Sequence, residues 1–81
     1  MQSTEKRSLE PMASIGAGVT EIRVHTAAEH RVFYIAKFAE SIYVLHAFEK
    51  RTRRTAQPDI ALAKKRFADL IRLRARKAVA Q

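Results

Sequence analysis

Hydrophobic and polar positions alternate along three segments in the first part of the chain. Within Glu21–His25, Ile22 and Val24 fall on one side and the three polar residues fall on the other. Residues 31–38 and 42–48 are rich in aromatic and β-branched side chains, which favour strands. The connections between these segments are short, and short connections favour antiparallel neighbours. The pattern therefore predicts a three-stranded antiparallel meander.

The period becomes helical after residue 55. One stripe is apolar and contains Ile60, Ala63, Phe67, Leu70 and Ile71. Thr55 is an N-cap candidate, and Asp59 places a negative charge near the positive end of the helix dipole. We predict a helix to residue 77 that packs its apolar stripe on the sheet. The expected fold class is α+β, a three-stranded sheet packed by a C-terminal helix.

The chain of 81 residues is expected to form one domain, over residues 15–77. Residues 1–14 are polar and show no regular period, so they are expected to be an irregular lead-in. Residues 78–81 are expected to fray. Gly16 and Gly18 begin a G-x-G pattern, but the third glycine of a dinucleotide-binding loop is absent. The pair predicts a turn that leads into a strand.

Positive charge is concentrated in the last part of the chain. The net charge is +8, with five basic and six acidic residues in 1–49 and eleven basic and two acidic residues in 50–81. Such a one-sided field attracts polyanions through counterion release and steering. Nucleic acid, anionic lipid and acidic proteins are the candidate partners, and a solvated basic tail is the alternative.

Composition narrows the classes of function. The chain has no cysteine, which excludes disulfides, thiolate nucleophiles and cysteine-ligated zinc. No apolar run approaches the roughly 20 residues of a membrane span, and the first ten residues lack a signal-peptide core. We expect a soluble, cytoplasmic protein without a cofactor.

Cations and an aromatic ring are predicted to share one face of the sheet. With strict alternation, Arg31 and Lys37 lie on one face of the second strand, beside His46, Phe48 and Lys50 of the third. A sheet covered by a single helix can leave its other face solvated. Cations on such a face contact phosphates while the ring stacks on an unpaired base. The prediction is a solvent-facing hollow, which a single bulge would alter.

Several stretches resemble the phage-derived branch of the RelE/ParE toxin superfamily, the HigB-like toxins of type II toxin–antitoxin systems. The resemblance covers residues 14–74 and is carried by Glu21–Arg23, Arg31–Phe38, Ile42–Lys50, Thr52, Thr55, Asp59–Ile60 and Ala63–Arg66. Its most specific part is the string Tyr43-Val44-Leu45-His46-Ala47-Phe48-x-Lys50-x-Thr52.

This resemblance implies an α+β toxin that cuts messenger RNA in the ribosomal decoding site without a metal. A helix-turn-helix antitoxin from the same operon is the implied partner. By position, Arg23, Arg31 and Lys50 correspond to phosphate-contacting or catalytic residues, and Phe48 to a base-stacking residue. Relatives usually carry a strand and a helical hairpin ahead of the matched region, which implies a largely missing hairpin here. The uncovered sheet edge would then pair with an antitoxin segment or a second copy.

Metal-free RNA cleavage needs a proton acceptor, a proton donor and cations near the phosphate. A lysine crowded by other cations can have a lowered pKa and so help with proton transfer. His46 and His25 are the alternative proton carriers, and an ordinary sheet histidine is the competing interpretation for each. The remaining expected RNA contacts are Lys37, Arg51, Arg53 and Arg54.

Three function classes stay open. The leading one is the ribosome-associated endoribonuclease toxin. The second is a non-catalytic protein, either a gyrase-directed ParE-like toxin or an inactive remnant that holds an antitoxin. The third is a basic DNA-binding module built on the helix of residues 59–77, although that helix lacks a preceding helix at helix-turn-helix spacing.

Overall fold

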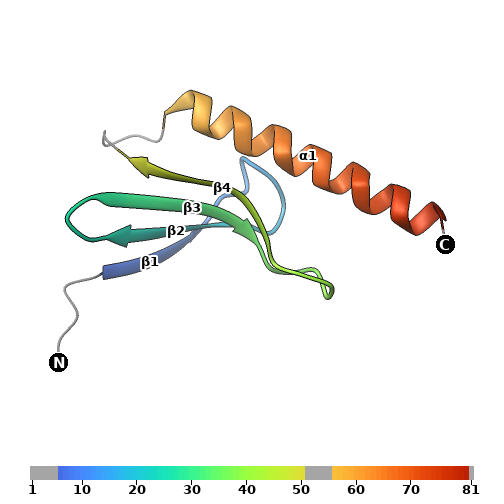
Figure 1. Ribbon diagram of the computed structural model, residues 1–81, viewed down its shortest axis with the longest axis horizontal. Helices are drawn as coiled ribbons and strands as arrows, with labels where there is room; N and C mark the ends of the chain where they lie inside the picture. Colours follow the sequence, from blue (N-terminus) through green and yellow to red (C-terminus); the bar gives the residue numbers. More distant parts are fainter. Residues whose placement is uncertain (1–5, 51–55, 81) are drawn as a thin grey trace.

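The computed structural model describes residues 6–50 and 56–80. It contains a four-stranded antiparallel sheet in the order β1-β2-β3-β4, followed by a single helix (Figure 1). The elements are β1 Lys6–Pro11, β2 Val19–His25, β3 Glu29–Ile35, β4 Tyr43–Lys50 and α1 Gln57–Ala80. The predicted α+β class and C-terminal helix are confirmed.

The predicted number of strands is wrong, because the structure has a fourth. Strand β1 lies in the segment for which irregular structure was expected, and it pairs with β2 from Lys6↔His25 to Pro11↔Thr20. An edge strand needs no alternating pattern when its backbone pairs with a neighbouring strand. The polar sequence of β1 therefore did not indicate a strand. Pro11 stands at the end of the strand, where the missing N–H is tolerated.

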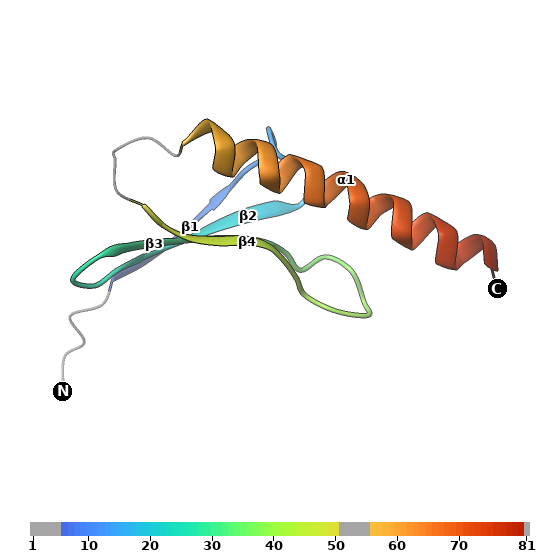
Figure 2. The ribbon, with the colours of Figure 1, turned by 45° about the horizontal axis from the view of Figure 1, so that its top comes forward.

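Helix α1 covers one face of the sheet, and its C-terminal turns extend beyond the sheet (Figure 2). The buried apolar residues come from the β1–β2 turn, three strands and the helix: Ile15, Val19, Phe33, Ile35, Leu45, Ala63 and Leu70. Phe33 and Ile35 are fully buried. This core is small, so its packing is sensitive to single substitutions.

The side of β2 that faces α1 is not the expected apolar side. Ile22 and Val24 point away from the helix and are only partly buried, whereas Glu21 is buried. The reason is the register, which pairs Glu21 with the fully buried Phe33. The alternating pattern therefore predicted which residues of β2 share a face, but it did not identify the face that α1 covers.

A β-bulge interrupts the pairing of β3 with β4. Phe33 pairs with His46 while the next residue, Tyr34, pairs with Val44, so Leu45 is the extra residue. The Leu45 carbonyl accepts a hydrogen bond from Nη1 of Arg66 at 2.8 Å. The bulge turns Val44 to the opposite face from His46, contrary to the strict alternation that was expected.

The helix follows the predicted stripe only in part. Ile60, Ala63, Phe67 and Leu70 pack against the sheet, but Ile71 is 40% exposed. The helix ends at Ala80, three residues later than predicted. Thr55, the expected N-cap, lies outside the described residues. Within the described part of the chain α1 is the only helix, so no helix-turn-helix pair occurs there.

The other face of the sheet has no described element over it (Figure 2). It presents Ile22, Val24, Val32 and Tyr34 in partly buried positions, and Leu9 and Val44 are largely exposed. No helix among the described residues is long and apolar enough to cross a membrane.

The β1–β2 turn fixes the position of α1 through a close contact at Gly16. A Cβ atom at this position would lie 2.6 Å from three ring atoms of Phe67. Gly16→Ala is therefore expected to displace the helix and to lower the free energy of unfolding by about 1–3 kcal/mol. Urea denaturation measures this change. Ala17→Ser, at an exposed neighbour, should stay within about 0.5 kcal/mol; equal stability of the two variants would show that the contact is easily relieved.

An ion pair ties the β3–β4 loop to the C-terminal half of α1. Arg74 donates to both carboxylate oxygens of Glu40, at 2.6 and 3.0 Å, and its guanidinium lies 3.5 Å from the Phe38 ring centroid. Tyr43 donates a further hydrogen bond to Glu40 at 3.0 Å. The hydrogen bond from Arg74 is the main cause that lowers the pKa of Glu40 to about 2.

Acid should release this ion pair. Because the folded-state pKa of Glu40 is below its ordinary value of 4.5, its contribution to stability is complete above pH 4.5 and is lost as the pH falls toward about 2. Glu40→Gln should lower stability at neutral pH and flatten its decline across that interval, as measured by denaturation midpoints. Glu49 is an exposed residue on the face of the sheet that α1 does not cover. The stability of Glu49→Gln should fall with pH as that of the wild type does. An unchanged profile for Glu40→Gln would rule out this pair as a source of acid sensitivity.

Candidate cationic site

Charged side chains gather at the end of the sheet that carries the β2–β3 hairpin. Strand register places three successive rows across the four strands, on the face that α1 covers. The outermost row is Lys6, His25, Glu29 and Lys50; the next is Ser8, Arg23, Arg31 and Phe48; the third is Glu10, Glu21, Phe33 and His46. Rows of this kind are roughly 7 Å apart along the strands. We call the charged and histidine side chains at positions 10, 21, 23, 25, 29, 31 and 50 the hairpin-end cluster.

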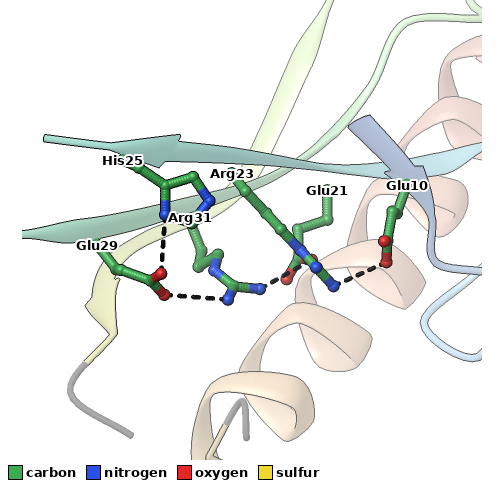
Figure 3. Close-up of polar contacts among 6 residues, drawn as sticks. All are labelled: Glu10, Glu21, Arg23, His25, Glu29 and Arg31. Atoms are coloured by element: carbon green, nitrogen blue, oxygen red, sulfur yellow. Dashed lines mark hydrogen bonds and ion pairs between the residues drawn. The ribbon is translucent and has the colours of Figure 1, made fainter. Parts of the chain in front are cut away.

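Glu21 is the centre of this cluster. One oxygen, Oε1, accepts a hydrogen bond from Nε of Arg23 at 2.7 Å and another from Nη1 of Arg31 at 3.1 Å. The hydrogen bond to Glu21 is the largest cause that raises the pKa of Arg23, and the negative charge of Glu10, whose carboxylate lies 2.7 Å from Nη2 of Arg23, adds to it. Glu21 therefore holds two guanidinium groups side by side (Figure 3).

Glu29 extends the network to a histidine. Its Oε2 accepts from Nη2 of Arg31 at 3.2 Å, and its Oε1 lies 2.8 Å from Nδ1 of His25. The hydrogen bond from Arg31 is the main cause that lowers the pKa of Glu29. In Figure 3 all these side chains extend from the same side of the sheet. The carboxylate thus links a buried guanidinium to an imidazole.

Burial within the cluster falls from its centre outward. Arg31 is only 5% exposed and Glu21 1%, while Arg23, His25 and Glu29 are partly exposed. The expectation that Arg31 projects into a solvent-facing hollow is therefore wrong, because the residue lies on the covered face and is paired with two carboxylates. Among the described residues, no hydrogen-bond partner reaches Nε of Arg31 or Oε2 of Glu21. These two buried atoms leave the polar network incompletely satisfied.

Lys50 lies beside Glu29 at the end of β4 and on the same face as Arg31. Its pKa is lowered, first by burial and next by the positive charge of Arg31, against the opposing effect of Glu29 and Glu21. The expectation that a lysine crowded by cations has a lowered pKa agrees with this direction. A lysine of this kind loses its proton more readily than a surface lysine.

His46 is placed differently from the rest of the predicted site. Its Nε2 lies 2.7 Å from Oδ1 of Asp59 in the first turn of α1, and its ring stacks on Phe48 at 4.9 Å between centroids. Phe48 in turn contacts Phe33 of the core. The pair of rings therefore joins β4 to the start of the helix, and Phe48 is partly buried in this position.

Lys37 does not join the cluster. Strand β3 ends at Ile35, so Lys37 lies at the opposite end of the sheet, where its side chain runs close to Gly18. Its Nζ is 5.4 Å from the Phe38 ring centroid. The other three expected RNA contacts, Arg51, Arg53 and Arg54, lie outside the described residues.

Sequence reasoning missed the three carboxylates of the cluster. A signal for two of them existed: Glu21-Ile22-Arg23 and Glu29-His30-Arg31 are two Glu-x-Arg strings, and residues two apart in a strand share a face. In both strings the glutamate bonds the arginine two positions later. Within the described residues no group of three or more side chains is arranged to hold a metal ion.

The sequence itself identifies a family. The family profile described as "Phage derived protein Gp49-like" matches residues 1–68, which is most of the chain. The chain belongs to the Gp49-like family. This is a family of RelE-type toxins, so the Gp49-like chain is toxin-like and an antitoxin is the partner that its family indicates. Searches of curated proteins and of solved structures give no match to the Gp49-like chain.

Proposed function

We propose that this Gp49-like protein is a HigB-like toxin of a type II toxin–antitoxin system and cuts messenger RNA on the ribosome without a metal. Family membership supports the toxin part of the proposal. The net charge of +8 supports a polyanionic target. The site we assign to this activity is the hairpin-end cluster, and the cell compartment is the cytoplasm.

The observation that carries the proposal is the environment of Lys50. Metal-free cleavage needs a group that can give a proton to the leaving 5′-oxygen, and a lysine with a lowered pKa meets this need. Arg23 lies one row further in and is partly exposed, so it can contribute positive charge to the phosphate. Arg31 is buried, so its proposed role is to set the charge around Lys50.

A second candidate function has its own observation. Three carboxylates, from Glu10, Glu21 and Glu29, already pair with the two arginines of the cluster. A phosphate would have to compete with them, which favours a non-catalytic protein that binds its antitoxin, as an inactive remnant or a gyrase-directed toxin does. In this second function, Arg23 and Arg31 stabilise the fold and do not bind phosphate.

Partner binding is proposed at the sheet edges. Strands β1 and β4 are the outer strands of the sheet order, and an outer strand can pair with an added strand. An antitoxin segment is the proposed occupant, with self-association of two copies as the competing one. Co-expression with a candidate helix-turn-helix antitoxin, followed by measurement of the mass of the complex, would show which occupant binds.

Mapping of transcript ends after a brief pulse of expression separates the two functions. The nuclease function predicts growth arrest and new ends clustered within translated codons, and both should disappear in Arg23→Ala. Arg76→Ala, which removes an exposed helix cation outside the cluster, should leave the ends unchanged. Growth arrest without new ends would favour a gyrase-directed toxin, and neither effect, with antitoxin binding retained, would favour a remnant.

A further inference from the structure

The hairpin-end cluster contains a histidine held by a carboxylate, in the same row as Lys50. His25 and Lys50 stand on β2 and β4, and Glu29 on β3 lies between them. Strands two apart in a sheet are separated by roughly 10 Å, so side chains from both can approach one phosphodiester from opposite sides. Attack by the 2′-hydroxyl and departure of the 5′-oxygen also occur on opposite sides of phosphorus.

The contact with Glu29 prepares His25 for proton transfer. The carboxylate lies 2.8 Å from Nδ1, and a ring that donates Nδ1–H to a carboxylate carries its lone pair on Nε2. The same carboxylate stabilises the imidazolium that forms when Nε2 takes a proton. Arg31 fixes the other oxygen of Glu29 at 3.2 Å, so the orientation of the acceptor is coupled to the buried centre of the cluster.

His25 fits this role better than the other two histidines. The His25 side chain is 39% exposed, whereas that of His46 is 14% exposed, lies 2.7 Å from Asp59 and stacks on Phe48. His30 pairs in register with Val24 and Glu49, on the opposite face of the sheet. Only His25 therefore combines exposure, a carboxylate partner and a place in the row of Lys50 among the described residues.

We infer that His25, oriented by Glu29, is the proton acceptor for the 2′-hydroxyl in the cleavage reaction; this inference rests on the proposed nuclease function. The 2′-hydroxyl gives its proton to Nε2 of His25 as the 2′-oxygen forms a bond to phosphorus. The bond from phosphorus to the 5′-oxygen breaks, and that oxygen takes a proton from the Lys50 ammonium. The products are a 2′,3′-cyclic phosphate and a 5′-hydroxyl, and water restores both side chains.

The charges around His25 come from its own strand and from β3 and β4. Glu29 faces the ring from β3, and Arg23 stands on the same face of β2. Arg31 acts through Glu29, and Lys50 lies beyond Glu29 on β4. Loss of Glu29 removes the only carboxylate paired with the ring among the described residues, so the imidazolium becomes harder to form.

The test measures cleavage of a translated message in an extract at a series of pH values. His25→Ala should lower the rate by about 10²–10⁴-fold, and the matched control His30→Ala should cleave as the wild type does. Glu29→Gln should retain part of the rate and shift the acid limb of the pH profile to lower pH. A merely structural role for Glu29 would lower the rate without moving that limb.

The outcomes distinguish this inference from the proposed function. If the wild type cleaves, Lys50→Ala does not, and His25→Ala cleaves fully, the assignment of His25 is overturned while the nuclease function stands. If the wild type does not cleave the message, both are overturned.

A second measurement does not depend on activity or on the folding of His25→Ala. In the wild type, nitrogen-15 shifts of the neutral His25 ring should report a hydrogen on Nδ1 and none on Nε2. Addition of a single-stranded oligonucleotide with 2′-deoxyribose throughout should shift the His25 ring signals and leave those of His30 in place. A hydrogen on Nε2 of the neutral ring, or shifts confined to other residues, would overturn the inference.

Discussion

Lys50→Ala is expected to reduce RNA cleavage by about 10²–10⁴-fold, the range for loss of a general acid or base. Lys50 is the proposed donor to the leaving 5′-oxygen, and burial together with Arg31 lowers its pKa. The rate of cleavage of a translated message, at saturating protein, measures the effect. Because the side chain stands at the end of β4, the fold should survive the substitution.

Two control variants sharpen this experiment. Lys65→Ala removes a lysine of the same charge from a 75% exposed position on α1, and it should cleave as the wild type does. Lys50→Arg keeps the positive charge, but a guanidinium does not release its proton, so it should restore RNA binding without restoring the rate. Full activity of Lys50→Ala, with Arg23→Ala inactive, would mean that the proton donor is another group.

Glu21→Leu is expected to lower the free energy of unfolding by about 3–5 kcal/mol, the usual cost of breaking a buried ion pair from one side. The carboxylate bonds both Arg23 and Arg31, and its removal leaves the buried Arg31 with Glu29 as its remaining carboxylate. Urea denaturation followed by circular dichroism measures the change. For a domain of marginal stability, this loss leaves much of the protein unfolded.

Two further variants distinguish the effect of breaking the buried ion pair from the effect of removing an exposed charge. Glu10→Gln removes an exposed partner of Arg23 and should cost about 0–1 kcal/mol. The double variant Glu21→Leu/Arg31→Met replaces the buried pair with apolar side chains and should recover most of the stability, because it leaves no uncompensated charge. A wild-type denaturation midpoint for Glu21→Leu alone would contradict the central place of Glu21 in the network.

Four of the five described elements could be predicted from periodicity, because each of these four has a strong local pattern. Strands β2, β3 and β4 alternate or are rich in β-branched and aromatic residues, and α1 repeats apolar residues at helical spacing. Strand β1 has no such pattern. It forms because its backbone pairs with that of β2, and this pairing cannot be seen in the sequence of β1 alone. The bulge at Leu45 likewise depends on pairing between strands and leaves no local signal.

The shared face of Arg31 and Lys50 could be predicted from the sequence, but the three carboxylates of the cluster and its burial could not. The sequence placed Arg31 and Lys50 on one face of neighbouring strands, and the structure has them there. It could not show which face α1 covers, since Glu21 makes the covered side of β2 look like a solvent side. Ion pairs with Arg23 and Arg31 allow Glu21 to be buried on the covered side. These pairs depend on distances between strands, which cannot be predicted from a single sequence.

The chemical nature of the RNA ends decides whether the hairpin-end cluster is a metal-independent centre of RNA cleavage. A translated message is incubated with the wild type, and the ends of the fragments are identified by mass spectrometry. The wild type should produce 2′,3′-cyclic phosphate and 5′-hydroxyl ends, and these ends should be absent with Lys50→Ala. Intact RNA, or fragments with 5′-phosphate ends, would contradict it.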